Sequence, residues 1–386
     1  MVLAGGRLDD GRLVDISTAD GLITAIEPAG DAPPDAINLD GRLVCAGMVD
    51  GHIHLDKTLL GLGWRPHRPG DTVAERIAEE KQVLRDERPS VVERASALVR
   101  HAVAHGTVRM RCHVDVDPDI GLANLHAIME VRARFAAWID IEIVAFPQSG
   151  ILAAPGTADL LDAAVAEGAD LVGGLDPAGI DGDVAGHLSA VFAVAERRHV
   201  GVDIHLHDGD SLGAFELRQI AERAHAAGMQ GCVAVSHAFA LGMVGDPEFG
   251  RTADALARGG VAIMTNGPGP AAMPPVKRLM AHGVTVFAGS DNIRDSWSPY
   301  GNGDMIERAM MIGYRAGFLA DADLRLAMDM ASGIAAAAMG VAGHAVRVGA
   351  VADLVVLNAA HVPEAVAARP AGRIVFKRGR IVPDRI

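Results

Sequence analysis

Residues 47–57 read GMVDGHIHLDK, and this stretch guides the interpretation of the rest of the chain. His52 and His54 end a short apolar run that is typical of a buried strand. Residues two apart on a strand point to the same face, so both imidazoles are predicted to lie side by side. Two neutral imidazoles supply half of a four-ligand metal site. The pair alone is a weak signal, because two half-exposed strand histidines give the same pattern.

Beyond this stretch, short apolar runs alternate with longer Ala-rich segments of helical character. Strand, helix and strand again indicate parallel pairing through right-handed crossovers, and eight such units close a (β/α)8 TIM barrel. A doubly wound open sheet is the competing fold, and the lack of a GxGxxG turn after any strand argues against it. The predicted strands cover residues 48–54, 107–114, 141–147, 171–175, 202–207, 232–237, 261–266 and 284–291.

Both ends of the chain have a different pattern, with short strand-like runs separated by Gly, Asp and Pro. The runs VLAGGRL, GRLVDIS and DGRLVCAG near the start are echoed by VADLVVLNA and RIVFKRGRIV near the end. We predict that residues 1–46 and 342–386 pair into one small β-sandwich domain, beside a barrel domain over residues 47–341. Two unrelated flanking hairpins are the alternative.

Polar residues of ligand type gather at the carboxyl ends of the predicted barrel strands. These ends converge on one mouth, where the active sites of this fold lie. Polar groups buried at random strand positions would be costly, so their collection at one edge predicts a site. For His113, a satisfied core histidine is at least as good an interpretation. The residues at these ends are His52, His54, His113, Gln148, His205, His207, His237, Asn266 and Asp291.

Five motifs in order, GMVDGHIHLDK, AFPQSG, VDIHLHD, VSHAFAL and GSDNIRDSW, resemble the amidohydrolase superfamily. They are most similar to its cytosine deaminase branch and to the related aminotriazine hydrolases. The resemblance covers all eight predicted strands and extends to the terminal segments, which resemble that family's split β-sandwich. It implies a hydrolase acting on carbon–nitrogen bonds other than peptide bonds, of the cyclic amidine deaminase type.

The resemblance also assigns roles to matching residues. The implied metal ligands are His52, His54, His205 and Asp291. The implied catalytic residues are Asp208, His237 and Asp291. The implied substrate contacts are Phe146, Gln148, Asn292 and Trp297.

In the implied mechanism, metal-activated water attacks the ring, Asp291 takes its proton, and His237 steadies the resulting hydroxide. Asp208 stands where the family has a proton-shuttling glutamate, and its reach is one methylene shorter. The substrate would then sit deeper, or His207 would share the role. Asn292 replaces an aspartate that is usual in cytosine deaminases, and an amide donates as well as accepts. Cytosine itself is therefore a less secure substrate.

We expect one divalent metal ion. Binuclear members of the superfamily bridge their metals with a carboxylated lysine after the third or fourth strand, and GGLDPAG at 173–179 holds none. Histidine and carboxylate ligands suit both Zn and Fe. Lys57 is interpreted as a supporting or loop residue beside the site, with a salt bridge at the rim as the alternative.

The expected function is hydrolytic deamination of a small amino-substituted nitrogen heterocycle, and a cytosine-like pyrimidine is the favoured substrate. One alternative is an amidohydrolase that releases an alkylamine from a triazine or opens a cyclic amide. A more distant one is a non-catalytic, metal-bearing binding module. A small heterocycle is the expected partner, and a homo-oligomer is possible.

Composition limits the partners and the cellular compartment that we expect for this protein. The net charge of −14 argues against nucleic acid and anionic membranes as partners. No apolar run of about 18 residues suggests a membrane span, and early charges argue against a signal peptide. Cys45, Cys112 and Cys232 lie in apolar runs without CxxC spacing, so buried, inert thiols in a reducing cytoplasm are expected. The histidines expected on loops or helix surfaces are His67, His101, His105, His126, His187, His199, His225, His282, His344 and His361.

Overall fold

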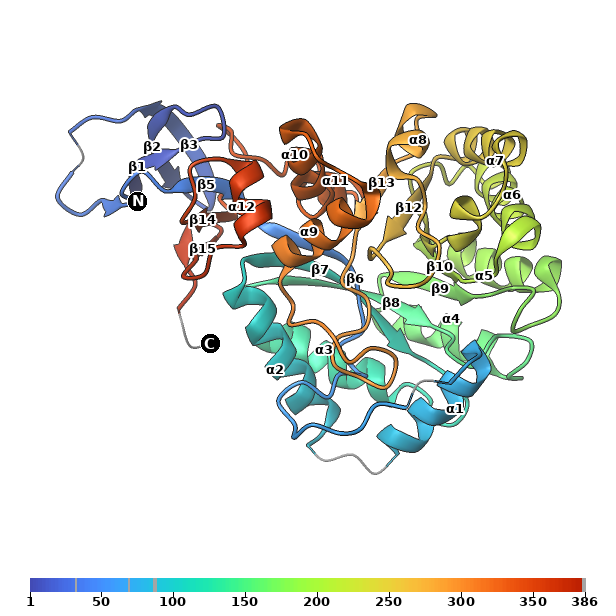
Figure 1. The fold of residues 1–386 in the computed structure, drawn as a ribbon. Helices are drawn as coiled ribbons and strands as arrows, with labels where there is room; N and C mark the ends of the chain where they lie inside the picture. The colour runs from blue at the N-terminus through green and yellow to red at the C-terminus, as the bar shows by residue number, and fades with distance from the viewer. Residues whose placement is uncertain (32, 69, 86–88, 384–386) are drawn as a thin grey trace.

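A computed structural model describes residues 1–31, 33–68, 70–85 and 89–383. Its core is an eight-stranded parallel sheet whose strands pair in chain order from first to last (Figure 1). These strands are β6 (Met48–Ile53), β7 (Thr107–Asp115), β8 (Asp140–Phe146), β9 (Leu171–Leu175), β10 (Gly201–Leu206), β11 (Val233–His237), β12 (Val261–Thr265) and β13 (Val286–Ala288).

The sheet closes on itself between its last and first strands. Ile53 and Asp291 form a parallel bridge, and the backbone N–H of Asp291 donates to the carbonyl of His52 at 2.7 Å. Strand β13 ends at Ala288, so Asp291 lies in the loop beyond the strand rather than at its predicted end. The predicted (β/α)8 barrel is confirmed.

Helices follow the strands and cover the outside of the barrel (Figure 1). The connection after β6 is the long one, and it carries the additional helix α1 (Val73–Leu84), which begins with a capping box between Thr72 and Glu75. The other helices of the barrel are α2 (Val91–Ala104), α3 (Ala123–Phe135), α4 (Thr157–Glu167), α5 (Val184–Arg198), α6 (Asp210–Ala226), α7 (Asp246–Gly259), α8 (Val276–Ala281), α9 (Met305–Ala316), α10 (Asp321–Met330) and α11 (Gly333–Ala338).

The strand sequences alternate between the helix-facing side and the barrel interior. On β10, Val202, Ile204 and Leu206 belong to the main apolar core together with residues of the surrounding helices. Asp203 and His205 alternate with them and are also buried. Because side chains on a strand point to opposite faces in turn, these polar residues line the barrel interior. The barrel therefore combines an apolar outer layer with a polar interior at its carboxyl end.

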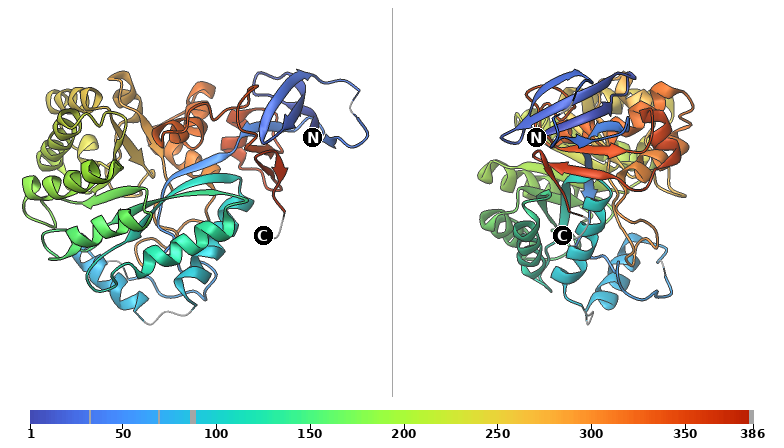
Figure 2. Two further views of the ribbon diagram at one scale, coloured as in Figure 1. Left: turned by 180° about the vertical axis from the view of Figure 1, so that it is seen from behind. Right: turned by 90° about the vertical axis from the view of Figure 1, so that its left-hand side faces the viewer.

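The two ends of the chain form a second sheet with its own apolar core. Strand β5 pairs antiparallel with β14, which places Cys45 opposite Val355 and joins the beginning of the chain to its end. Figure 2 shows these first and last strands side by side, at one side of the barrel. The alternative of two unrelated hairpins is wrong. The elements are β1 (Val2–Arg7), β2 (Leu13–Ala19), β3 (Leu22–Pro28), β4 (Ile37–Asn38), β5 (Leu43–Ala46), β14 (Leu354–Leu357), α12 (Val362–Ala368), β15 (Ile374–Lys377) and β16 (Arg380–Ile381).

The domain limits at 46/47 and 341/342 stay a proposal. Within the described ranges, no helix combines the length and the apolar character needed to cross a membrane.

Two expectations about single residues are wrong. Cys232 is exposed, because strand β11 begins one residue later, at Val233, and leaves the thiol on the preceding turn. His187 is fully buried on α5 rather than solvated. Its Nδ1 lies 2.7 Å from Asp181 Oδ2, so a hydrogen bond satisfies that nitrogen, whereas Nε2 has no partner among the described residues.

Candidate active site

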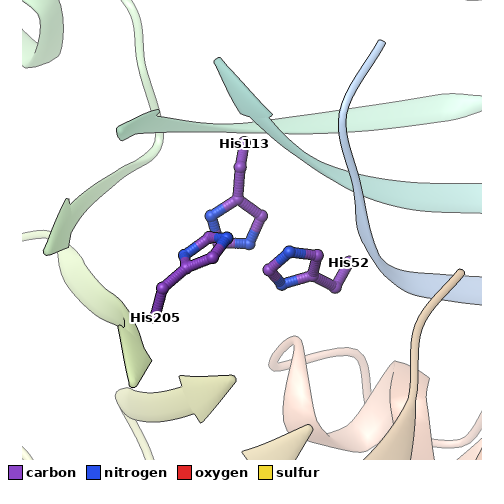
Figure 3. A group of neighbouring side chains, drawn as sticks. All are labelled: His52, His113 and His205. Carbon is purple, nitrogen blue, oxygen red and sulfur yellow. The ribbon is translucent and has the colours of Figure 1, made fainter. Parts of the chain in front are cut away.

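Three imidazoles from three strands converge inside the barrel at its carboxyl end. Figure 3 shows the rings of His52, His113 and His205 turned toward one another. The ring centroids of His52 and His113 lie 3.9 Å apart in a stack, and that of His205 lies 4.5 Å from the His52 centroid. Each ring offers a nitrogen within 4.8 Å of the other two, as a metal site requires.

The four predicted metal ligands lie together in the same cluster. The Nε2 atom of His54 is 3.3 Å from the Nε2 atoms of both His52 and His205. Asp291 Oδ1 lies 3.6 Å from the Nε2 atoms of His52 and His54. The three histidines are at most 3% exposed. His113 adjoins this set, so the geometry also offers a second grouping of His52, His113 and His205.

The electrostatics of the cluster favour neutral imidazoles. Burial first, and then neighbouring positive charge, holds the pKa of His52, His54 and His205 well below the usual value. Neutral imidazole is the form that binds metals. Burial raises the pKa of Asp291, against the opposing effect of His207 and other cations.

The Nε2 atoms of His52 and His205 both lie 3.3 Å from His54 Nε2, and neutral imidazoles can turn their lone pairs to a cation held among these atoms. A carboxylate next to neutral imidazoles is a donor set that zinc and iron accept. The residues present therefore fit a divalent ion.

His237 and His207 extend the site from the neighbouring strand ends. Their rings stack with centroids 4.5 Å apart. Both ring nitrogens of His237 are buried and lack a hydrogen-bond partner among the described residues, so they are available to a bound molecule. His207 Nδ1 lies 2.8 Å from Asp176 Oδ2. Burial is the largest single influence on the pKa of His207 and lowers it, but the Asp176 carboxylate together with Asp291 and Asp208 outweighs burial, and the pKa is raised.

The backbone is strained at several of these strand ends. Asp176, His237, Ala238 and Asp291 adopt positive φ angles of 36°, 75°, 46° and 61°. Such conformations are uncommon outside glycine and cost about 1–3 kcal/mol each. Their concentration where β9, β11 and β13 end supports a functional role for this mouth.

Asp208 bonds to groups outside the histidine cluster. Its Oδ2 accepts a hydrogen bond from Gly179 N at 2.8 Å, and its carboxylate pairs with Glu216 of α6. Burial raises the pKa of Glu216 to about 8, so Glu216 holds the proton of this carboxyl pair near neutral pH. These described partners are not among the predicted metal ligands, whereas His207, one residue earlier, stacks on His237.

Phe146 is the last residue of β8, and Gln148 follows the strand by two residues. The Phe146 ring lies 4.1 Å from that of His205 and 5.6 Å from that of His54, measured between centroids. Gln148 is 2% exposed, and its Nε2 has no described partner. A buried amide donor without a partner costs free energy unless a ligand or water satisfies it.

Asn292 and Trp297 are held by a residue that sequence reasoning missed. Asp295 accepts hydrogen bonds from Asn292 Nδ2 at 2.7 Å and from the Trp297 backbone N–H at 2.8 Å. Burial raises the pKa of Asp295 to about 7. The buried carboxyl of Asp295 thus holds the loop after β13 and fixes the two predicted substrate contacts, Asn292 and Trp297.

Lys57 is buried, which excludes the alternative of a salt bridge at the rim. Its Nζ lies 3.0 Å from Asp115 Oδ1 and 3.3 Å from Glu80 Oε2, and 5.3 Å from the centre of the Phe146 ring. Glu80, on α1, also accepts a hydrogen bond from Trp297 Nε1 at 2.5 Å. Helix α1 is therefore attached to the mouth through Glu80.

Only partial signals in the sequence pointed to these residues. Lys57 stands three residues after the HxH pair, but Glu80 and Asp115 carry no local signature. Asp203 and Ser236, which lie beneath the cluster, each belong to a motif that contains a predicted site histidine.

A parallel barrel whose mouth gathers histidines and a carboxylate is the arrangement of a hydrolytic barrel enzyme. Residues 35–383 match the model of the Amidohydrolase family, and the chain belongs to that family.

Three relatives show how far the similarity extends. The chain is 31% identical to N-isopropylammelide isopropyl amidohydrolase of Pseudomonas sp. (strain ADP) over 357 residues, which is 90% of this chain and 88% of the relative. A crystal structure of N-isopropylammelide isopropylaminohydrolase from Burkholderia multivorans ATCC 17616 is 40% identical, with a TM-score of 0.94 over 99% of this chain and 97% of that one. The 5-methylcytosine deaminase from Klebsiella pneumoniae, liganded with phosphonocytosine, is 27% identical, with a TM-score of 0.89 over 100% and 98%.

Proposed function

We propose that the chain is a metal-dependent hydrolase that cleaves an exocyclic carbon–nitrogen bond of a small nitrogen heterocycle. The observation that carries this proposal is the cluster of His52, His54, His205 and Asp291 at the barrel mouth, within 3.3–3.6 Å contacts. We propose these four residues as the ligands of one divalent ion, zinc or iron. The chemistry that such an ion supplies when bound is a water whose pKa is lowered to about 7.

Asp291 is the proposed base. Its Oδ2 accepts a hydrogen bond from Asn266 Nδ2 at 2.7 Å, which fixes the carboxylate, while Oδ1 faces the histidines. His237 is the proposed donor to the attacking oxygen, because its ring nitrogens lack other partners among the described residues.

The leaving nitrogen needs a proton, and the site offers two candidate donors of that proton. Asp208 corresponds to the family carboxylate, and Glu216 holds a proton beside it. His207 stacks on His237 and is oriented by Asp176. We propose that His207 shares this role, because its ring stacks directly on that of His237, and efficient proton transfer depends first on geometry.

Four residues are proposed to orient the flat ring. Phe146 forms an apolar wall beside His205, and Gln148 offers a buried, unpartnered amide. Trp297 packs against the apolar cluster that contains Phe146, and Asp295 fixes both Trp297 and Asn292. A few directional polar groups on apolar walls are typical of small-molecule sites.

Within this class we propose that an alkylamino-substituted triazine is a better substrate than a cytosine-like pyrimidine. The support is the higher identity, 31% and 40%, to two enzymes named for N-isopropylammelide, against 27% to the 5-methylcytosine deaminase. Asn292 in place of the aspartate usual in cytosine deaminases agrees with this order. We also propose a cytoplasmic location, since the three described cysteines are free.

Product analysis tests the proposal. Full-length protein is loaded with zinc or iron, its metal content is measured, and it is incubated with N-isopropylammelide, cytosine, isocytosine, creatinine and pterin. We expect isopropylamine release from N-isopropylammelide, with kcat/KM at least about 100-fold above that for cytosine. Ammonia release from cytosine at the higher rate would reverse the substrate order. Failure of a fully metallated protein to turn over any of these compounds would refute the proposed activity.

A further inference from the structure

A chain of buried hydrogen bonds leads from His52 into the barrel interior. His52 Nδ1 lies 2.8 Å from Ser236 Oγ, and Ser236 Oγ lies 3.0 Å from Asp203 Oδ1. The other oxygen of Asp203, Oδ2, accepts a hydrogen bond from Arg111 Nη1 at 2.9 Å. Ser236, Asp203 and His52 are 0% exposed and Arg111 is 4% exposed, so water does not compete for these bonds.

The position of these residues follows from the strand register. Asp203 precedes His205 by two residues on β10, and Arg111 precedes His113 by two residues on β7, so each lies one step deeper on the interior face. Ser236 on β11 is paired in register with His205. This series of hydrogen bonds therefore lies directly beneath the histidine cluster.

The chemistry of the groups fixes the direction of every hydrogen bond. The Arg111 guanidinium only donates, and the Asp203 carboxylate beside it only accepts. The single hydroxyl hydrogen of Ser236 is thus committed to Asp203 Oδ1. Ser236 Oγ then offers His52 nothing but lone pairs, so His52 Nδ1 carries the ring hydrogen and donates it to Oγ.

The consequence is a defined tautomer of His52. With the hydrogen on Nδ1, the lone pair of the ring is on Nε2, which is the atom that lies 3.3 Å from His54 Nε2 and 3.6 Å from Asp291 Oδ1. The stacked ring of His113, with its centroid 3.9 Å away, packs against the His52 ring and restricts its rotation.

We propose that Arg111, Asp203 and Ser236 are positioning residues that hold His52 in the Nδ1–H tautomer and so present Nε2 to the cation. This inference rests on the proposed metal-dependent function. None of the three residues contacts the substrate in this proposal, because they lie below the histidines. Partners of this kind typically change metal affinity by about 10- to 100-fold when they are removed.

The test compares Ser236→Ala with Ser236→Thr, which keeps the hydroxyl. Ser332→Ala is the matched control, because Ser332 is another buried serine that donates a single hydrogen bond, to the carbonyl of Gly47 at 3.0 Å, outside the histidine cluster. Zinc affinity of the full-length apo proteins is measured by competition with a chromophoric chelator. The absorption spectrum of the Co²⁺-substituted proteins reports the ligand geometry, and circular dichroism confirms folding.

We expect Ser236→Ala to bind zinc about 10- to 100-fold more weakly, with a changed Co²⁺ spectrum. Ser236→Thr and Ser332→Ala should stay near the wild type. A folded Ser236→Ala protein with wild-type zinc affinity and an unchanged spectrum would overturn the inference. So would an equal loss in folded Ser236→Thr, because packing and not the hydroxyl would then be responsible. If the wild-type protein itself binds no zinc or iron, the failure lies in the proposed function instead.

Discussion

The backbone N–H of Asp291 donates to the carbonyl of His52 at 2.7 Å, and this bond joins the end of the barrel to its beginning. Through it, the loop after the last strand brings its carboxylate to within 3.6 Å of two histidine side chains of the first strand segment. The contact that closes the barrel therefore also brings Asp291 to the histidines of the candidate site.

Asp291→Asn should abolish most turnover, because an amide cannot take a proton from water at neutral pH. We expect kcat to fall by about 10²- to 10⁴-fold, the usual contribution of a general base, and metal content to fall as well. Amine release and metal analysis on the same sample measure both effects. The exposed carboxylate of Asp254 provides the control, Asp254→Asn, which should be unchanged. Near-normal kcat in Asp291→Asn would rule out the assigned base.

His54→Ala and His113→Ala distinguish the two possible groupings of histidines. We expect His54→Ala to lose most of the bound metal, since His54 Nε2 contacts the Nε2 atoms of both His52 and His205. His113→Ala should keep the metal and instead lose about 1–3 kcal/mol of folding stability, because it empties a buried, stacked position. Metal stoichiometry and denaturant unfolding measure the two effects. The reverse pattern would make His113 a ligand in place of His54.

Glu80→Ala should weaken substrate binding more than it slows the chemical step. Glu80 links α1 to Trp297 and Lys57, and its removal leaves the indole N–H and the buried ammonium short of one acceptor. We expect KM to rise about tenfold, the effect of about 1.4 kcal/mol, with a smaller change in kcat. The neighbouring variant Glu79→Ala serves as the control in steady-state kinetics. A large fall in kcat with KM unchanged would contradict a role in holding the wall of the site.

Glu216→Gln should alter how stability depends on pH. Burial raises the pKa of Glu216 from 4.5 to about 8 in the folded protein, so the folded state binds more protons than the unfolded state between these values. Stability contributed by this group therefore falls as pH rises from about 4.5 to 8. Glutamine mimics the protonated form and avoids this loss.

Denaturant unfolding at pH 5 and pH 8 measures the effect. We expect Glu216→Gln to be more stable than the wild type by about 1 kcal/mol or more at pH 8, with a smaller difference at pH 5. Glu222→Gln, an exposed position on the same helix, should show no such trend. Equal differences at both pH values would mean that Glu216 is ionised in the folded protein across this range.

Much of the fold was predictable from local pattern. Seven of the eight barrel strands end within one residue of the predicted position, because buried parallel strands are short apolar runs with clear boundaries. The eighth, β13, is shorter than predicted, since its polar end GSD leaves the regular strand pairing and keeps one bridge to the first strand, between Asp291 and Ile53. Local pattern also failed for Cys232 and His187, whose exposure depends on neighbours distant in sequence.

The sequence by itself determined the barrel, the pairing of the two chain ends and the histidines that meet at the mouth, because strand alternation and strand order place those side chains. Only the tertiary structure decided which groups support them. The Lys57–Glu80 contact, the Asp208–Glu216 pair and the bond of Asp203 to Ser236 join residues 8 to 33 positions apart, on different elements. Their roles depend on burial, which removes water and makes each unpaired charge or lone pair costly. No local pattern records that constraint, since it arises only when the barrel closes.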